Sequence, residues 1–294
     1  MFSGSMVAVV TPMTDDGGLD LAAWQRLLEW HLASGTDAIV IGGTTGESPT
    51  LTAGELAGLT ERALAVVGKR IPVIVGTGTN ATAGTVERTR TLSRLGVDGV
   101  LIVTPYYNRP PQEGLYRHFM AAADASAVPV ILYNVPSRTA VDLLPATIAR
   151  LAAHPRIAAV KEASGQLGRV REIRERCPDG VAVLAGEDAL ARESMLTGAR
   201  GVISVTANVA PRSMHQMCSA ALAGDAARAE SIDATLGGLH RGLFVEANPI
   251  PVKWALAEMG LIGRGLRLPL TPLAPEHHAT VRAALQRAGV LALR

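Results

Sequence analysis

Short apolar runs alternate with longer amphipathic stretches over the first two thirds of this 294-residue chain. Eight of these runs are rich in valine and isoleucine and are followed by glycine or polar residues. We predict strands at Val7–Val10, Ala38–Ile41, Val73–Val75, Val100–Val103, Val130–Tyr133, Ile157–Val160, Val181–Leu184 and Val202–Val205. Because the runs are apolar at successive positions, both faces of their sheet should be covered, which is typical of a parallel sheet.

The stretches between the runs carry helix signals. Trp24, Leu28 and Leu32 share one face of a predicted helix, and Thr52 and Glu55 have the spacing of a capping box. Regular alternation of strand and helix indicates an α/β fold, and eight units over about 200 residues predict a (β/α)8 TIM barrel. A doubly wound sheet is the competing fold, but no predicted strand leads into a GxGxxG turn.

The strand pattern stops after about Pro211, and helical segments take over. We predict helices within Ala226–Leu243, Val252–Glu258 and Thr280–Ala288. The expected organisation is therefore a catalytic barrel over residues 1–210 and a C-terminal helical extension over residues 211–294.

Composition narrows the classes of function. The net charge of +2 arises from 28 basic and 26 acidic residues that are interspersed, so no nucleic-acid partner is expected. No apolar stretch reaches the roughly 18–20 residues of a membrane span, and the N-terminus lacks a basic signal-peptide region. Cys177 and Cys218 lie far apart and read as reduced thiols. We expect a cytoplasmic protein with no membrane partner.

Lysine is scarce in this chain. Only Lys69, Lys161 and Lys253 are lysines, and all the other basic residues are arginines. Lys161 ends the apolar run that starts at Ile157, where a lysine can also simply extend its amine to water. Arginine cannot replace lysine as a nucleophilic amine, because guanidinium stays protonated whereas a desolvated ammonium loses its proton more readily. Lys161 is therefore the candidate nucleophile.

Polar residues gather where the predicted strands end, and a TIM barrel carries its chemistry at this face. Three of the four tyrosines in the chain belong to this set. The segments that follow the second to eighth strands are Gly42–Ser48, Gly76–Asn80, Thr104–Asn108, Tyr133–Thr139, Lys161–Glu162, Gly186–Asp188 and Ile203–Asn208. Each residue alone has an ordinary structural explanation, but together they predict one polar cavity.

The predicted cavity has the parts of a lysine-dependent aldolase. A neutral Lys161 amine can form a Schiff base with a 2-oxo acid. Thr44 and Thr45 offer hydrogen bonds to a small carboxylate, and the Tyr133 phenol can carry protons. Arg138 offers a planar fork to a second carboxylate. No metal-ligand cluster and no phosphate-binding Gly-Lys-Ser/Thr motif is present, so we expect no metal or other cofactor and an unphosphorylated keto acid.

Six segments, in order along nearly the whole chain, carry a family resemblance. They are Gly42–Ser48, Thr104–Pro110, Tyr133–Thr139, Val160–Ala163, Gly201–Asn208 and Leu243–Trp254. The chain resembles the 4-hydroxy-tetrahydrodipicolinate synthase (dihydrodipicolinate synthase) family of the pyruvate-dependent class I aldolase and N-acetylneuraminate lyase superfamily. The resemblance implies a lyase that condenses pyruvate with L-aspartate 4-semialdehyde to give 4-hydroxy-tetrahydrodipicolinate. That reaction is the first committed step toward diaminopimelate and lysine.

The resemblance also implies roles for the reacting groups. Lys161 would form the Schiff base with pyruvate, Tyr133 would shuttle protons and Thr44 would relay them. The position of Tyr107 completes the relay from a neighbouring subunit in this family. We therefore expect a homotetramer built as a dimer of tight dimers.

The remaining implied roles concern substrate binding. Thr45 would hold the pyruvate carboxylate, and Arg138 would help hold the semialdehyde. Ile203 would contribute through its backbone, and Gly186 is expected to belong to the same substrate site. Lys253 matches a family position too, and we interpret it as structural.

Lysine inhibits many bacterial members of this family at the dimer interface. Ser48, Asn80 and Tyr106 match kept positions of that allosteric site. Positions that are often His, His and Glu in inhibited relatives are Ala53, Leu56 and Gly84 here. Losing a carboxylate that pairs with the buried ammonium of the inhibitor should cost roughly 1.5–3 kcal/mol. We predict weak or absent lysine inhibition.

Three other functions remain as alternatives. An N-acetylneuraminate lyase or 2-keto-3-deoxy sugar acid aldolase would share Lys161 and Tyr133, but its pocket would not be expected to place arginine at position 138. A catalytically silent keto-acid sensor should have lost one of the Lys, Tyr or Thr residues of the mouth, and none is missing. A metal-dependent barrel hydrolase is disfavoured by the lack of a ligand cluster.

Overall fold

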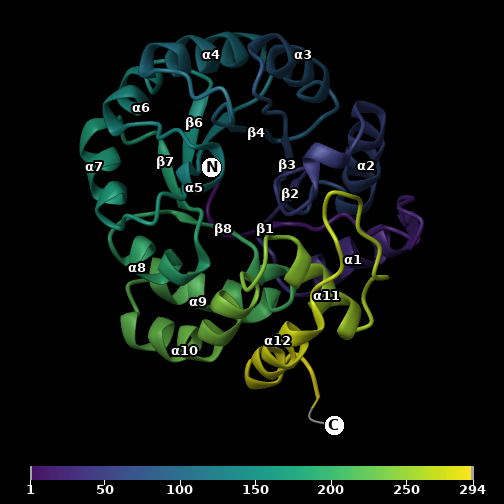
Figure 1. Ribbon diagram of the computed structural model, residues 1–294. Helices are drawn as coiled ribbons and strands as arrows, with labels where there is room; N and C mark the ends of the chain where they lie inside the picture. Colours follow the sequence, from purple (N-terminus) through teal and green to yellow (C-terminus); the bar gives the residue numbers. More distant parts are fainter. Residues whose placement is uncertain (1, 293–294) are drawn as a thin grey trace.

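The computed structural model describes residues 2–292 of the chain. Its eight strands pair in parallel in sequence order, and β1 pairs with β8, which closes the barrel. The strands are β1 (Gly4–Ala8), β2 (Ala38–Ile41), β3 (Val73–Gly76), β4 (Gly99–Val103), β5 (Val130–Asn134), β6 (Ile157–Glu162), β7 (Ala182–Ala185) and β8 (Gly201–Ser204). All eight overlap the predicted runs, and the predicted (β/α)8 barrel is confirmed (Figure 1).

Helices surround the strands in a ring. The helices are α1 (Leu21–Ala33), α2 (Ala53–Val67), α3 (Thr82–Leu92), α4 (Gln112–Ala125), α5 (Pro136–Thr139), α6 (Pro145–Leu151), α7 (Gly168–Arg176), α8 (Ala191–Leu196), α9 (Pro211–Leu222), α10 (Ala226–Gly242), α11 (Ile250–Glu258) and α12 (Pro275–Arg287). α11 and α12 lie outside this ring (Figure 1). Short 3₁₀ turns are η1 (Ser48–Thr50), η2 (Asp188–Leu190) and η3 (Thr206–Asn208). Thr52 and Glu55 form the predicted capping box at the start of α2.

The strand β1 begins earlier than predicted, at Gly4. Gly4 pairs with Gly201 of β8, and a Cβ on Gly201 would lie 2.3 Å from the Gly4 carbonyl oxygen. The two backbones therefore approach more closely than a residue with a side chain would allow. This pairing closes the barrel at its seam, where the sequence shows glycine rather than an apolar run.

Apolar side chains fill two separate cores. One lies inside the barrel and includes Met6, Val40, Ile74, Ile131 and Leu184. The larger one lies between the outer faces of the strands and the surrounding helices. Because each strand points side chains alternately to both cores, its sequence is apolar throughout.

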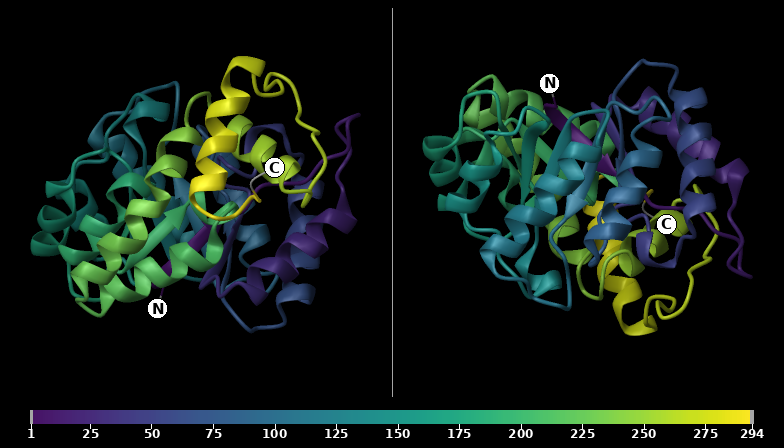
Figure 2. Two further views of the ribbon diagram at one scale, coloured as in Figure 1. Left: turned by 90° about the horizontal axis from the view of Figure 1, so that it is seen from below. Right: turned by 90° about the horizontal axis from the view of Figure 1, so that it is seen from above.

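α11 and α12 lie toward the end of the barrel opposite the chain's N-terminus, as both views in Figure 2 show. α9 contacts β1 and β8, and α10 packs on α9 and α12. α11 contacts α12 and η3. The division into residues 1–210 and 211–294 remains a prediction, and α9 belongs by its contacts to the ring around the strands. No helix of residues 2–292 is long and apolar enough to span a membrane.

Candidate active site

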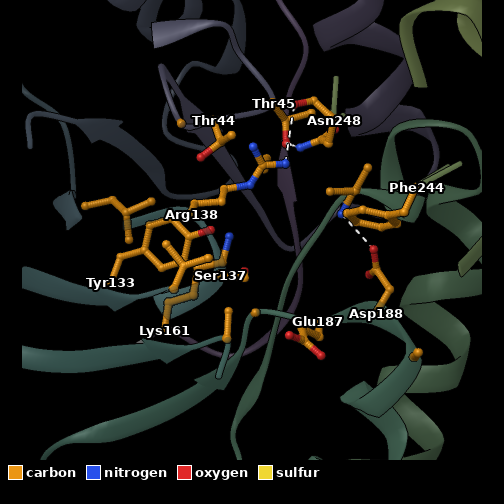
Figure 3. A pocket seen from close by; sticks show the side chains of 18 of the residues that line it. Thr44, Thr45, Tyr133, Ser137, Arg138, Lys161, Glu187, Asp188, Phe244 and Asn248 are labelled. Carbon is orange, nitrogen blue, oxygen red and sulfur yellow. Dashed lines mark hydrogen bonds between the residues drawn. The ribbon is translucent and has the colours of Figure 1, made fainter. Parts of the chain in front are cut away.

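A cavity of about 320 Å³ opens at the carboxyl ends of the strands. The loops after β2, β5, β6 and β7 line it on the barrel side, and the segment between α10 and α11 lines it from the C-terminal extension. Six of the predicted site residues meet there. They are Thr44, Thr45, Tyr133, Arg138, Lys161 and Gly186 (Figure 3).

Lys161 and Tyr133 are neighbours on adjacent strands. They are register partners on β6 and β5, so both side chains point to the same side of the sheet. The Lys161 Nζ atom lies 4.3 Å from the centroid of the Tyr133 ring, and Lys161 is 6% exposed. This geometry places an amine directly beside a phenol at the mouth of the barrel.

Burial lowers the pKa of Lys161 to about 8. The carboxylate of Asp188 acts in the opposite direction, and the positive charge of Arg138 adds to the lowering. Because desolvation disfavours the ammonium form, a substantial fraction of Lys161 is a neutral amine at slightly alkaline pH. Desolvation therefore supplies a nucleophilic amine at position 161.

Burial also raises the pKa of the Tyr133 phenol. Arg138 and the hydroxyl of Thr44 oppose the increase. The phenol is therefore protonated at neutral pH, and it can give a proton to a reacting atom and take one back.

Asp188 is a cavity residue whose role the sequence did not predict. It lies on η2 directly after β7, and its Oδ2 accepts hydrogen bonds from the backbone N–H groups of Val205 and Thr206, each at 2.9 Å. Asp188 is almost fully buried and lines the same cavity as Lys161. Its negative charge limits how far the pKa of Lys161 falls. The sequence shows that this carboxylate follows a strand, but it does not show which way the side chain points.

The C-terminal extension supplies one wall of the cavity. The Asn248 side-chain amide donates to Thr45 Oγ1 at 2.9 Å, and the Asn248 carbonyl accepts from Arg138 Nη2 at 3.4 Å. Phe244 and His240 line the same wall. The two residues predicted to bind carboxylates are thus both held by one residue from a distant part of the chain (Figure 3).

Two predicted residues lie outside the cavity. Tyr107 is 88% exposed and adopts a positive φ of 76° in the loop after β4. Ile203 is fully buried inside the barrel. Within a single chain, neither side chain reaches the cavity that contains Lys161, and their predicted roles stay predictions.

The positions predicted for lysine binding lie around the loops after β2, β3 and β4. Ser48 lines a small cavity that also touches Thr44 and Tyr133. The Asn80 carbonyl accepts from the Asn108 side chain at 2.7 Å, and Tyr106 is partly exposed.

The substituted positions nearby offer few polar groups. Leu56 is 2% exposed and packs beneath Gly42, while Ala53 and Gly84 carry no functional group. Across residues 2–292, no group of three or more His, Cys, Asp or Glu side chains is arranged to hold a metal ion.

Comparisons with known proteins agree on one family. The model of the dihydrodipicolinate synthetase family matches residues 1–288. The 4-hydroxy-tetrahydrodipicolinate synthase of Methylococcus capsulatus is 55% identical over 291 residues, which cover 99% of this chain and 100% of the relative. That of Azoarcus is 53% identical over 292 residues, with the same coverage of both chains.

Solved structures give the same result. The chloride-inhibited dihydrodipicolinate synthase of Acinetobacter baumannii, determined in complex with pyruvate, is 48% identical with a TM-score of 0.97. The match covers 99% of this chain and 100% of that one. A dihydrodipicolinate synthase variant described as monomeric is 40% identical with a TM-score of 0.96, covering 99% of this chain and 98% of that chain.

Proposed function

The chain belongs to the dihydrodipicolinate synthetase family, and we propose that its cavity performs the reaction of its 4-hydroxy-tetrahydrodipicolinate synthase relatives. The protein is a lyase that condenses pyruvate with L-aspartate 4-semialdehyde to give 4-hydroxy-tetrahydrodipicolinate and water. Its product enters the route to diaminopimelate and lysine. The A. baumannii relative was solved with pyruvate, which supports pyruvate as the first substrate here.

The reaction starts at Lys161. Its neutral amine attacks the keto carbon of pyruvate, and loss of water leaves a Schiff base. Removal of a proton from the pyruvate methyl group gives an enamine, whose carbon attacks the aldehyde carbon of the semialdehyde. The amino group of the second substrate then attacks the imine carbon and releases Lys161, which closes the product ring.

Tyr133 and Thr44 serve the proton transfers of this sequence. The phenol lies beside the Lys161 amine, so it can protonate the departing hydroxyl of the carbinolamine and the new alkoxide. Thr44 passes the proton onward. We assign the third member of the relay to Tyr107 of a second copy of the chain, because its exposed ring is free to enter a neighbouring site.

Thr45 and Arg138 bind the substrates' carboxylates. The Thr45 hydroxyl and the backbone N–H groups of its glycine-rich turn suit the pyruvate carboxylate. The Arg138 guanidinium lies close to Thr45, and its planar fork suits the carboxylate of the semialdehyde (Figure 3). Gly186 lines the cavity with its backbone, and Ile203 contributes through its main chain. Ser48, Asn80 and Tyr106 form the remnant of a lysine site.

The proposed assembly is a dimer of tight dimers that works in the cytoplasm. A relay completed by Tyr107 requires two copies at the least. Cys177 and Cys218 are both unpaired thiols, which agrees with a reducing compartment.

The observation that carries this proposal is the buried Lys161 amine, with its pKa lowered to about 8, directly beside the Tyr133 ring. The test is borohydride reduction in the presence of pyruvate, followed by peptide mass spectrometry. We expect a pyruvyl adduct on Lys161 in the natural protein and none in the Lys161→Arg variant. An adduct on Lys69 or Lys253 instead would refute the assignment.

A turnover assay separates the sister activities. Turnover is followed with pyruvate and aspartate semialdehyde in one arm and with N-acetylneuraminate or a 2-keto-3-deoxy sugar acid in the other. Condensation of the semialdehyde is the expected result, and cleavage of the sugar acid without it would assign the cavity to a sugar-acid aldolase.

A further inference from the structure

The turn that carries Thr44 and Thr45 has an unfavourable backbone conformation. Glu47, near its end, adopts a φ of 57°, in the left-handed region that non-glycine residues rarely occupy. A Cβ on Gly76 of the next strand would lie 2.1 Å from the Gly42 carbonyl oxygen, so the turn also lies tightly against β3. A strained conformation of this kind persists only where surrounding contacts hold it.

The contact that holds Glu47 comes from the C-terminal extension. Lys253 of α11 donates from Nζ to Glu47 Oε1 at 2.5 Å, and their side chains are 1% and 0% exposed. A buried charge that loses its partner strongly destabilises the fold. The pair therefore couples the position of α11 strongly to the conformation of the turn.

The second oxygen of Glu47 extends this attachment. Glu47 Oε2 accepts from the backbone N–H of Arg267 at 3.3 Å. The Arg267 guanidinium in turn bonds the Thr50 carbonyl at 2.7 Å and the Glu55 carboxylate at 2.5 Å and 2.9 Å. One carboxylate thus joins the turn to two separate segments of the extension.

The extension also contacts the proposed carboxylate binders directly. Asn248, five residues before Lys253 on the chain, donates to Thr45 from its side chain and accepts from Arg138 at its backbone carbonyl. Displacement of α11 would therefore move these groups together with the turn. Since misplacement of a binding group by about 1 Å can cost two orders of magnitude in rate, such coupling reaches function.

We propose that Lys253 is a positioning residue that acts through Glu47 to hold the Thr44–Thr45 turn in the geometry that binds the pyruvate carboxylate. This inference rests on the proposed function of the cavity. Lys253 touches no substrate, and its role is to fix the backbone that does. The proposal also explains why position 253 is lysine in an arginine-rich chain, because a compact ammonium needs fewer buried partners than a guanidinium with five N–H donors.

The test compares Lys253→Met with the double variant Lys253→Met/Glu47→Gln. The single variant leaves Glu47 buried without its cation, so stability should fall and the KM for pyruvate should rise roughly tenfold or more. The double variant removes both charges, so stability should recover toward that of the natural protein. The raised KM should remain, with a smaller change in kcat, because Lys161 and Tyr133 are held by β6 and β5.

If the folded double variant has the same KM for pyruvate as the natural protein, the proposal is overturned and the pair is a purely structural contact. If the Met variants do not fold, Glu47→Gln alone decides the question, because it keeps Lys253 and the size of the side chain at position 47. Its KM for pyruvate should rise. An unchanged KM would refute the positioning role.

Arg282→Met provides the matched control. It removes the 2.6 Å ion pair with Glu258 between α12 and α11, away from the cavity, and it should leave the pyruvate KM unchanged. Borohydride trapping of the natural protein runs in parallel. Absence of an adduct there refutes the proposed function, whereas an adduct combined with an unaltered KM in the variants refutes only the role of Lys253.

Discussion

Replacing Lys161 by Met should abolish the reaction and make the folded protein more stable at neutral pH. Burial lowers the pKa of Lys161 from 10.5 to about 8, so the folded protein holds the ammonium less favourably than the unfolded chain does. One pKa unit corresponds to about 1.4 kcal/mol, and the charged side chain therefore reduces the free energy of unfolding by about 3 kcal/mol. The Lys161→Met variant removes this penalty and keeps an unbranched side chain of similar length.

The effect depends on pH with a definite sign. Between about 8 and 10.5 the unfolded chain binds more protons than the folded protein, so the stability of the natural protein rises with pH in this window. The variant has no group that titrates there. Its advantage should be largest at neutral pH and should shrink progressively as the pH approaches 10.5.

The assay is chemical or thermal unfolding of both proteins, at one concentration, over a series of pH values. A difference of this size at neutral pH shifts the midpoint by several degrees in a chain of this length. Lys69→Met is the matched control, because the Lys69 side chain is 72% exposed and should show no comparable gain. Equal stability of the natural protein and the Lys161→Met variant, or an advantage that does not vary with pH, would refute the reasoning.

Four further outcomes test the site. Asp188→Asn keeps the acceptor for the backbone N–H groups but removes the charge that raises the pKa of Lys161; the pH profile of borohydride trapping should shift to lower pH, and an unmoved profile contradicts this. Arg138→Lys keeps the charge but loses the planar fork, so kcat/KM for the semialdehyde should fall about tenfold or more, with little change in Schiff-base formation by pyruvate. Co-expression of Tyr107→Phe with Lys161→Met should restore part of the activity that each variant lacks alone, and failure to do so argues against a relay shared between copies. Initial rates across a lysine titration should show weak or no inhibition. Strong inhibition at sub-millimolar lysine would contradict this prediction.

Much of the barrel could be predicted because its signals are local. Each strand contains an apolar run that two cores enclose, and α1 and α2 carry their own caps. The candidate nucleophile was also visible, because lysine is rare in this chain and Lys161 ends a strand. The early start of β1 was not visible, since glycine seams form by close backbone approach rather than by apolar patterning.

The missed parts of the site depend on contacts between distant segments. Asn248 and Thr45 are 203 residues apart, and Lys253 and Glu47 are 206 apart. No periodicity or motif spacing reports such a pair, so the interpretation of Lys253 as structural names no partner for it. Asp188 was seen as a polar residue after a strand, but its effect on Lys161 depends on burial and direction, which only the three-dimensional arrangement provides.

The segment between α10 and α11 forms one wall of the cavity, so the chain cannot be shortened to the barrel alone without opening the active site. A protein cut back to the strands and the helices around them would still contain the amine and the phenol, yet it would lack the side chains that close the pocket above them. Engineering this protein to accept a new aldehyde should therefore vary residues of the barrel loops and of the segment between α10 and α11 together, because neither part alone defines the shape of the substrate pocket.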